Sequence, residues 1–279
     1  MNSGQYQIYD IDKSLPGLFL RAGVMADRRQ KIEAGIRHLT RRSELDRVNW
    51  RRDLEIGLLD KGLSLLGLRR QGEENTRDVR LRELTVSPSN LPPALSGFRI
   101  LHLSDLHFGV SFPAHAEAVY RIVEGIEADC CVITGDFRYG HFGPSYHVAS
   151  MTAQMLAGTR FRHGVYAVLG NHDSLVIGER LESIGVRVLY NEGILLEAAG
   201  AAFWLAGVDD PHFFRCHDLA AAFQGAPTGI FSILLAHSPE LYREAAERGV
   251  DLYLCGHTHG GQVCLPGIGA VNKNARCRR

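Results

Sequence analysis

The sequence lacks a long apolar run. The candidate stretch at residues 56–68 is about 13 residues long and contains Asp60 and Lys61, so it is too short and too charged to span a bilayer. Pairs of arginines occur, but none precedes the uncharged apolar stretch that a twin-arginine export signal needs. We therefore expect a cytoplasmic protein, at most peripheral to an inner membrane.

The sequence also has no excess of either charge, and it has few cysteines. The 279 residues include 31 Lys and Arg against 31 Asp and Glu, so no overall field favours nucleic acid or an anionic membrane. The six cysteines show no spacing typical of a disulfide framework. Apolar residues make up 45% of the chain, which is ordinary for a globular protein. The composition therefore indicates a folded protein that is large enough for one domain with a sizeable hydrophobic core.

The charge balance divides the chain into two parts. Residues 1–82 contain 17 Lys and Arg and 12 Asp and Glu, whereas the remainder contains 14 and 19. We predict a basic, helical N-terminal extension with a polar linker at residues 1–78, followed by a catalytic domain at residues 79–279. The acidic balance of the second part suits a domain that gathers metal-binding carboxylates.

The extension has two interpretations. Leucines and isoleucines recur at roughly helical spacing over residues 27–70, and Gly35, Gly57 and Gly62 are expected to divide this stretch into two or three helices. The helices either dock on the main domain or contact a membrane peripherally through residues 1–71, with Arg-rich polar faces and leucine-rich apolar faces. We favour the docked interpretation.

Five short apolar runs have the length and β-branched content of buried strands. They lie at residues 98–103, 130–134, 165–169, 230–235 and 250–255. Helix-like stretches such as 114–127 and 146–156 lie between some of them. Alternation of strands and helices predicts an α/β fold. Open α/β sheets bind ligands at the carboxyl ends of their strands.

A polar motif follows each of these runs. The motifs are Ser104-Asp105-Leu106-His107, Gly135-Asp136-Phe137, Gly170-Asn171-His172-Asp173, Ala236-His237-Ser238 and Gly256-His257-Thr258-His259-Gly260-Gly261-Gln262. In extended backbone, residues i and i+2 point to the same side, so His257 and His259 are expected to face one space. Carboxylates and imidazoles without Cys suit Mn, Fe, Zn, Co or Ni. The set is too large for one ion and fits two, which is the arrangement that hydrolyses phosphoesters.

Each motif has a simpler explanation when taken alone. Asp105 with His107 could be a surface or capping pair, and Gly-Asn-His-Asp is a typical turn sequence. The order of all five motifs at strand ends favours a shared site. Other polar residues have weaker support: His102 is expected to pack on the sheet, His141 and His147 to lie in a solvated loop, and Asp209 and Asp210 to shape either a cleft rim or a turn.

In this order, the motifs resemble the calcineurin-like metallophosphoesterase superfamily, and Ser-Asp-Leu-His with Gly-His-Thr-His-Gly-Gly-Gln resembles its bacterial branch of phosphodiesterase-like proteins. The resemblance covers about residues 79–267. It implies a four-layer α/β/β/α sandwich. The family continues with further strands after the position of Pro266, so we expect that the last strands are missing or that the sequence is truncated or frame-shifted.

The resemblance also implies a role for each site residue. One metal would be held by Asp105, His107, Asp136 and His259, and the other by Asp136, Asn171, His237 and His257, with Asp136 as the bridge. Manganese is the favoured metal, and a bridging hydroxide would be the nucleophile. His172 would protonate the leaving oxygen or stabilise charge in the transition state. Asp173 would hydrogen-bond His172 and fix its tautomer.

Substrate and function class remain open among several alternatives. The substrate would be a soluble phosphodiester or nucleotide, or a lipid-linked pyrophosphate as in UDP-2,3-diacylglucosamine pyrophosphatase-like enzymes of lipid A synthesis. The apolar loop 108–113 would suit a lipid. A non-catalytic scaffold of the same fold is disfavoured, because the chain keeps all seven ligands and His172. A nuclease is disfavoured because residues 83–279 are net acidic.

Overall fold

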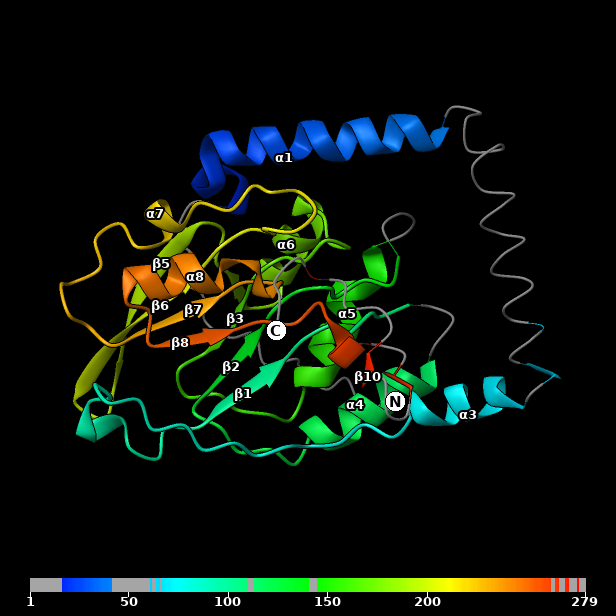
Figure 1. The fold of residues 1–279 in the computed structure, drawn as a ribbon, viewed down its shortest axis with the longest axis horizontal. Coiled ribbons are helices and arrows are strands. Elements are labelled where there is room, and N and C mark those ends of the chain that lie inside the picture. Colours follow the sequence, from blue (N-terminus) through cyan, green and yellow to red (C-terminus); the bar gives the residue numbers. More distant parts are fainter. Residues whose placement is uncertain are drawn as a thin grey trace.

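Two four-stranded sheets form the centre of the computed structural model (Figure 1). The structure describes residues 17–41, 61, 64–65, 67–109, 113–140, 145–261, 264–265, 269–270 and 275. The first sheet is parallel throughout, in the order β1 (Ile100–Leu103), β2 (Cys130–Ile133), β3 (Val165–Ala167) and β4 (Val186–Val188). Its crossovers contain α4 (Pro113–Val123), α5 (Tyr146–Leu156) and α6 (Leu175–Ser183), as parallel neighbours require.

The second sheet is mixed. Its order is β5 (Glu192–Ala198), β6 (Ala201–Gly207), β7 (Ser232–Leu235) and β8 (Leu252–Leu254), with β5 antiparallel to β6 and the other pairs parallel. Ala199 and Gly200 join β5 to β6 in a tight turn in which both have positive φ values, 53° and 83°. The segments α7 (Leu219–Ala222), η2 (Pro239–Leu241) and α8 (Tyr242–Arg248) lie between the later strands.

The side chains of β2 show how the layers are stacked. Successive residues of a strand face opposite sides of the sheet. Cys131 and Ile133 pack with residues of α4, α5 and α6, whereas Cys130 and Val132 pack against strands of the second sheet. A third apolar cluster lies between the other face of the second sheet and the residues of α7 and α8. The predicted α/β/β/α sandwich is therefore confirmed.

The N-terminal helix α1 (Leu18–Arg41) lies on the helical layer of the first sheet, beside α6. Leu18 and Ala26 are buried in the core that this layer covers. The backbone departs from helical geometry at Gly23. The predicted break at Gly35 is wrong, because α1 continues through it; a glycine costs a helix only about 1 kcal/mol, and docking offsets that cost. Gly57 and Gly62 lie outside the described residues.

Three remaining segments flank the sandwich. The helix α3 (Leu68–Asn75) and the short turn η1 (Pro93–Leu95) precede β1. Near the C-terminus, β9 (Cys264–Leu265) pairs with β10 (Gly269–Ala270) in an antiparallel ladder. Residues 262–263, 266–268, 271–274 and 276–279 lie outside the described part of the chain, so the expectation about the last strands stays a prediction.

None of the described helices has both the length and the apolar character needed to cross a bilayer.

Candidate metal centre

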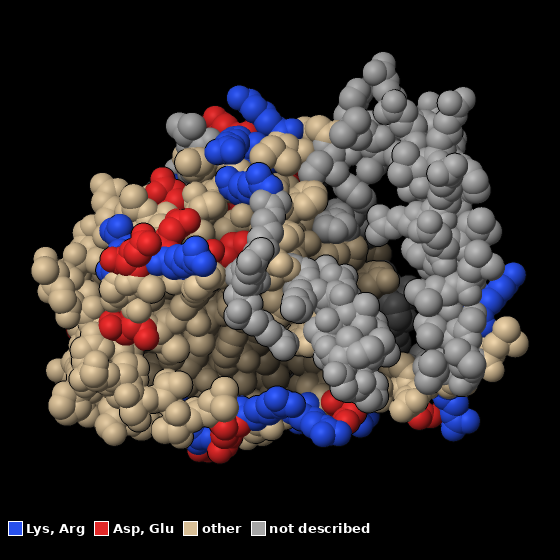
Figure 2. All heavy atoms as spheres, viewed as in Figure 1, with Lys and Arg blue, Asp and Glu red and all other residues tan. Residues whose placement is uncertain are grey.

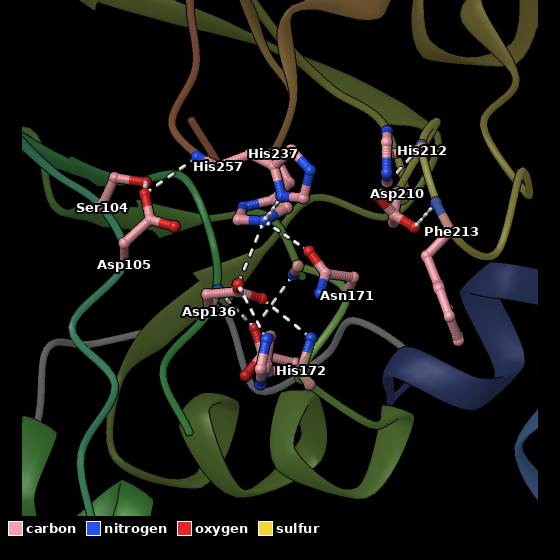
Figure 3. A network of polar contacts seen from close by, with 12 residues as sticks. Ser104, Asp105, Asp136, Asn171, His172, Asp210, His212, Phe213, His237 and His257 are labelled. Atoms are coloured by element: carbon pink, nitrogen blue, oxygen red, sulfur yellow. Dashed lines mark hydrogen bonds and ion pairs between the residues drawn. The ribbon is translucent and has the colours of Figure 1, made fainter. Parts of the chain in front are cut away.

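The carboxyl ends of five strands meet between the two sheets. In the first sheet, Leu103 pairs with Ile133, and Ile133 with Ala167, so three strands end at one level. In the second sheet, Leu235 pairs with Leu254 in the same way. The loops that follow these strands carry all five motifs predicted from the sequence (Figure 3).

Hydrogen bonds join these loops within and between the sheets. The N–H groups of Asp105 and His107 donate to the carbonyls of Gly135 and Asp136, at 3.0 and 2.9 Å. Between the sheets, the His257 N–H donates to Asp105 Oδ2 at 2.9 Å, and His237 Nδ1 lies 2.8 Å from the carbonyl oxygen of Thr134. Asp105 and His237 are therefore each hydrogen-bonded to backbone groups of the opposite sheet's loops.

The backbone is left-handed at five of the seven predicted ligands. Their φ values are 53° at Asp105, 44° at His107, 56° at Asp136, 72° at His257 and 47° at His259. Non-glycine residues rarely adopt this region, and each instance costs about 1–3 kcal/mol. The expectation of extended backbone at His257 and His259 is thus wrong. Both imidazoles reach the centre from a tight turn that includes η3 (His259–Gly261).

Asp105, His107 and His259 form a partly accessible group, here called the open cluster. His107 Nε2 lies 3.1 Å from His259 Nε2, and the two imidazole rings are stacked with centroids 5.0 Å apart. His259 Nε2 also lies 3.3 Å from Asp105 Oδ1. Three potential ligand atoms thus face one small volume.

Asp136, Asn171, His237 and His257 form a second group, here called the buried cluster. His237 Nε2 is 3.2 Å from Asp136 Oδ2, 3.0 Å from Asn171 Oδ1 and 3.1 Å from His257 Nδ1. Asp136 Oδ2 is also 3.8 Å from His107 Nε2. Asp136 therefore lies between the two clusters, and the two histidines of Gly256-His257-Thr258-His259 belong to different clusters.

The donor atoms fit metal ions. Ligand atoms about 2.1 Å from one shared ion lie roughly 3.0–3.4 Å from each other. The three distances from His237 Nε2 in the buried cluster match this spacing. In the open cluster two distances match it, while His107 Nε2 lies 4.0 Å from Asp105 Oδ1. Asp105 Oδ1 is buried and lacks a hydrogen-bond partner among the described residues, although buried polar atoms normally have one. Nitrogen and carboxylate donors suit divalent ions such as manganese or zinc.

The buried cluster shifts the pKa values of its members. Burial disfavours the charged forms of His237 and Asp136, but their mutual attraction outweighs it, so the pKa of His237 rises to about 10 and that of Asp136 falls below its usual range. Burial and the nearby charge of His237 lower the pKa of His257. Burial also lowers the pKa of His259 in the open cluster. Without metal, His237 and Asp136 are therefore an imidazolium–carboxylate pair.

His172 lies beside both clusters. Its Nε2 is 3.8 Å from Asp136 Oδ2, and its ring centroid is 4.9 Å from that of His107. Arg138, which the sequence analysis did not single out, donates two hydrogen bonds to the His172 carbonyl, from Nε at 3.0 Å and Nη2 at 2.7 Å. The backbone of His172 is thus fixed, and its imidazole lies next to the two clusters.

Asp173 has a different role from the predicted one. Its Oδ2 accepts hydrogen bonds from the N–H groups of Asp136 and Gly170, at 2.8 and 2.9 Å, and its Oδ1 accepts from those of Phe137 and Arg138, at 3.0 and 3.3 Å. The prediction that this carboxylate fixes the His172 tautomer is corrected accordingly: Asp173 joins the β2 and β3 loops through backbone amides. A Cβ on Gly170 would overlap the Asp136 carboxylate, which explains the glycine there.

A sixth strand end contributes residues that the sequence analysis did not assign to the centre. After β6, the Asp210 carboxylate accepts from the N–H groups of His212, Phe213 and Phe214, so it shapes a turn. The His212 ring lies 4.4 Å from that of His257, and its Nδ1 is 2.5 Å from Glu240 Oε1. The sequence does contain an apolar run before Asp209-Asp210 that could have predicted this strand, but no metal-ligand motif follows the run.

The remaining polar residues lie at the edge of the site or away from it. His102 Nε2 is 2.9 Å from Thr134 Oγ1, and His147 Nε2 is 3.2 Å from the carbonyl oxygen of Phe108. Tyr139 is largely exposed, with its ring 6.5 Å from that of His107. His141 lies outside the described residues.

Comparison with known proteins agrees with this geometry. The family described as calcineurin-like phosphoesterase matches residues 98–261. The uncharacterised metallophosphoesterase YkoQ of Bacillus subtilis is 28% identical over 205 residues, which are 70% of this chain and 73% of that protein. Phosphodiesterase YaeI of Escherichia coli is 32% identical over 181 residues, 62% of this chain and 64% of that protein. A bovine transmembrane protein with a metallophosphoesterase domain is 33% identical over 193 residues, 62% of this chain but only 43% of that protein.

Proposed function

Because the chain belongs to the calcineurin-like phosphoesterase family, we propose that it hydrolyses phosphodiester or pyrophosphate bonds at a dinuclear metal centre. The observation that carries the proposal is the position of Asp136. Its Oδ2 lies 3.2 Å from His237 Nε2 in the buried cluster and 3.8 Å from His107 Nε2 in the open cluster. A carboxylate between two sets of nitrogen donors is suited to bridge two ions.

The two clusters supply the ligands in this proposal. Asp105, His107, Asp136 and His259 would hold one ion, and Asp136, Asn171, His237 and His257 would hold the other; most of these side chains lie in His and Asp groups close enough together to hold a metal. Manganese is the favoured metal. When bound, such a metal pair polarises the phosphoryl group and activates water as the nucleophile. The chain itself contributes fixed ligand positions, since the left-handed loops and their hydrogen bonds hold the side chains in place.

His172 acts on the leaving group in this proposal. Its Nε2 lies next to Asp136 and His107, so a phosphoryl group bound over the clusters would be within its reach. Nε2–H then donates a proton or a hydrogen bond to the leaving oxygen. Arg138 supports this role, because its two hydrogen bonds to the His172 carbonyl fix the residue that carries the imidazole.

The substrate class is proposed from the similarity to a named relative. The E. coli relative is named a phosphodiesterase, which supports a phosphodiester; the lipid-linked pyrophosphate stays the alternative. Cytoplasmic location, peripheral membrane contact through residues 1–71 and absence of nucleic-acid binding also stay proposals. In support of the last, basic and acidic side chains of the described residues are interspersed on the face drawn in Figure 2.

Metal analysis followed by a substrate panel tests the proposal. We expect purified protein to contain about two equivalents of transition metal and, after reconstitution with Mn²⁺, to hydrolyse bis-p-nitrophenyl phosphate. A lipid-linked pyrophosphate and a nucleotide in the same panel separate the substrate classes. Stoichiometric metal without turnover of any substrate would favour a scaffold of the same fold instead.

A further inference from the structure

Arg29 is a charged residue with no exposed surface, and it lies in α1, outside the residues that match the family. A buried guanidinium is costly unless every part of it is paired. Its position in the N-terminal helix, far in sequence from the ligands, calls for a physical explanation.

The guanidinium contacts both ends of the loop that carries Asn171 and His172. Arg29 Nη2 donates to the carbonyl of Gly170 at 3.1 Å and to that of Asp173 at 2.7 Å. Arg29 Nη2 therefore links Gly170, which precedes Asn171, to Asp173, which follows His172. Because both acceptors are main-chain carbonyls, the contacts fix the path of the loop itself.

The rest of the guanidinium is held rigidly by other elements. Its Nη1 forms a buried ion pair with Asp209, and its Nε donates to Glu33 Oε1 at 3.1 Å. The Phe214 ring lies 3.8 Å from the guanidinium carbon. Asp209 in turn accepts a hydrogen bond from Tyr190 at 2.7 Å. The planar guanidinium, with donors in a fixed geometry, thus connects α1, the β3 loop and the β6 loop.

We propose that Arg29 is a positioning residue of the metal centre, which holds the loop 170–173 so that Asn171 and His172 face the two clusters. The inference rests on the proposed function. It makes α1 part of the support of the site, with Arg29 acting through the loop and not on the substrate.

Arg21 provides a matched control on the same helix. Its side chain is mostly buried and forms ion pairs with Glu182 and Glu192, and it also donates to the Val188 carbonyl. None of these partners belongs to the loop 170–173. Replacing Arg21 therefore disturbs the docking of α1 through its contacts to Glu182, Val188 and Glu192.

The experiment compares full-length Arg29→Met, Arg21→Met and the double variant Arg29→Met/Asp209→Asn. The double variant removes the carboxylate charge that Arg29→Met would leave buried and unpaired, so it keeps the test informative if the single variant folds poorly. The readouts are Mn²⁺ affinity, kcat and KM on bis-p-nitrophenyl phosphate, and amide exchange of residues 170–174 in the metal-free proteins.

We expect both Arg29 variants to lose about 10–100-fold in Mn²⁺ affinity or kcat, as for other groups that orient ligands, with KM changed less than kcat. Exchange over residues 170–174 should accelerate in these variants alone. Equal effects of Arg21→Met and Arg29→Met on all readouts would overturn the inference while leaving the proposed function intact. A wild-type chain that neither binds Mn²⁺ nor hydrolyses a phosphoester would overturn the proposed function, and this inference with it.

Discussion

The open and buried clusters differ in how far solvent reaches their side chains. In the open cluster, the side chains of His259, His107 and Asp105 are 28%, 19% and 11% exposed. In the buried cluster, His237 is fully buried and Asp136 is 2% exposed. A substrate must therefore approach over the open cluster, whereas the buried cluster lies where the two sheets meet.

This difference in exposure indicates that the two clusters contribute differently to the stability of the protein. His237 pairs with Asp136 and with the Thr134 carbonyl, so it joins the second sheet to the first. His259 pairs with residues of the open cluster, which water also reaches. We expect substitutions in the buried cluster to lower both the stability of the protein and its affinity for metal. Substitutions in the open cluster should lower the affinity for metal and the turnover of substrate.

The largest effect is expected where the clusters meet. Asp136→Asn keeps the shape of the side chain but removes the charge between the two sets of nitrogen donors. We expect phosphodiester hydrolysis to fall to the uncatalysed background and metal content to fall by at least one ion per chain, measured by steady-state kinetics and elemental analysis. Glu197→Gln, on β5, is a control that should keep both. Full activity of Asp136→Asn would contradict the bridging role.

The two clusters should differ in how far His237→Ala and His259→Ala destabilise the protein. Removing His237 takes away the imidazolium that lies nearest to the buried Asp136 carboxylate, which should cost about 3–5 kcal/mol in the free energy of unfolding of the metal-free protein. Removing His259 should cost about 1 kcal/mol or less, since its contacts are partly solvated. Urea unfolding in the presence of a chelator measures both. Equal losses would show that the two clusters are supported alike.

The smallest effect is expected from a change of one pH unit, and it should be specific to the buried cluster. The pKa of His237 is raised from 6.5 to about 10, so its pairing stabilises the metal-free protein below pH 6.5, and this contribution is lost as pH rises through about 10. Metal must displace this proton. Mn²⁺ affinity at the buried cluster should therefore rise about tenfold per pH unit within this window.

Titrations with Mn²⁺ at pH values one unit apart measure this slope. His259→Ala should keep it, because that variant leaves His237 and Asp136 unchanged. A slope that disappears in His259→Ala would assign the displaced proton to the open cluster.

Local sequence patterns predicted an α/β fold and the convergence of the motifs at strand ends, whereas the four layers were implied by the resemblance to the family. Apolar runs marked the five strands that precede a motif, and the helix expected at residues 146–156 has the bounds of α5. The runs that became β4, β5 and β6 carry no ligand motif, so reasoning from motifs did not reach them. His212, which follows β6, was missed for the same reason.

Other features depend on contacts between distant residues and could not be predicted. Asp173 was expected to pair with its neighbour His172, but its partners include Asp136, 37 positions away. Arg29 lies 141 positions from Gly170, and nothing in a stretch of basic helix distinguishes it from the exposed Arg28. Left-handed backbone at Asp105 or His259 was equally hidden, since even aspartate and histidine, which adopt it more often than other non-glycine residues, do so at a small minority of positions.

The left-handed ligand positions also determine how far this site could be rebuilt elsewhere. A designer who grafted the seven side chains onto regular strand ends of another α/β protein would obtain the same residues pointing in other directions. The new protein would also have to reproduce the positive backbone φ angles at the positions of Asp105, His107, Asp136, His257 and His259. Ligand exchange at these positions is therefore limited to residues that tolerate a positive φ, such as asparagine for aspartate, and β-branched replacements are excluded.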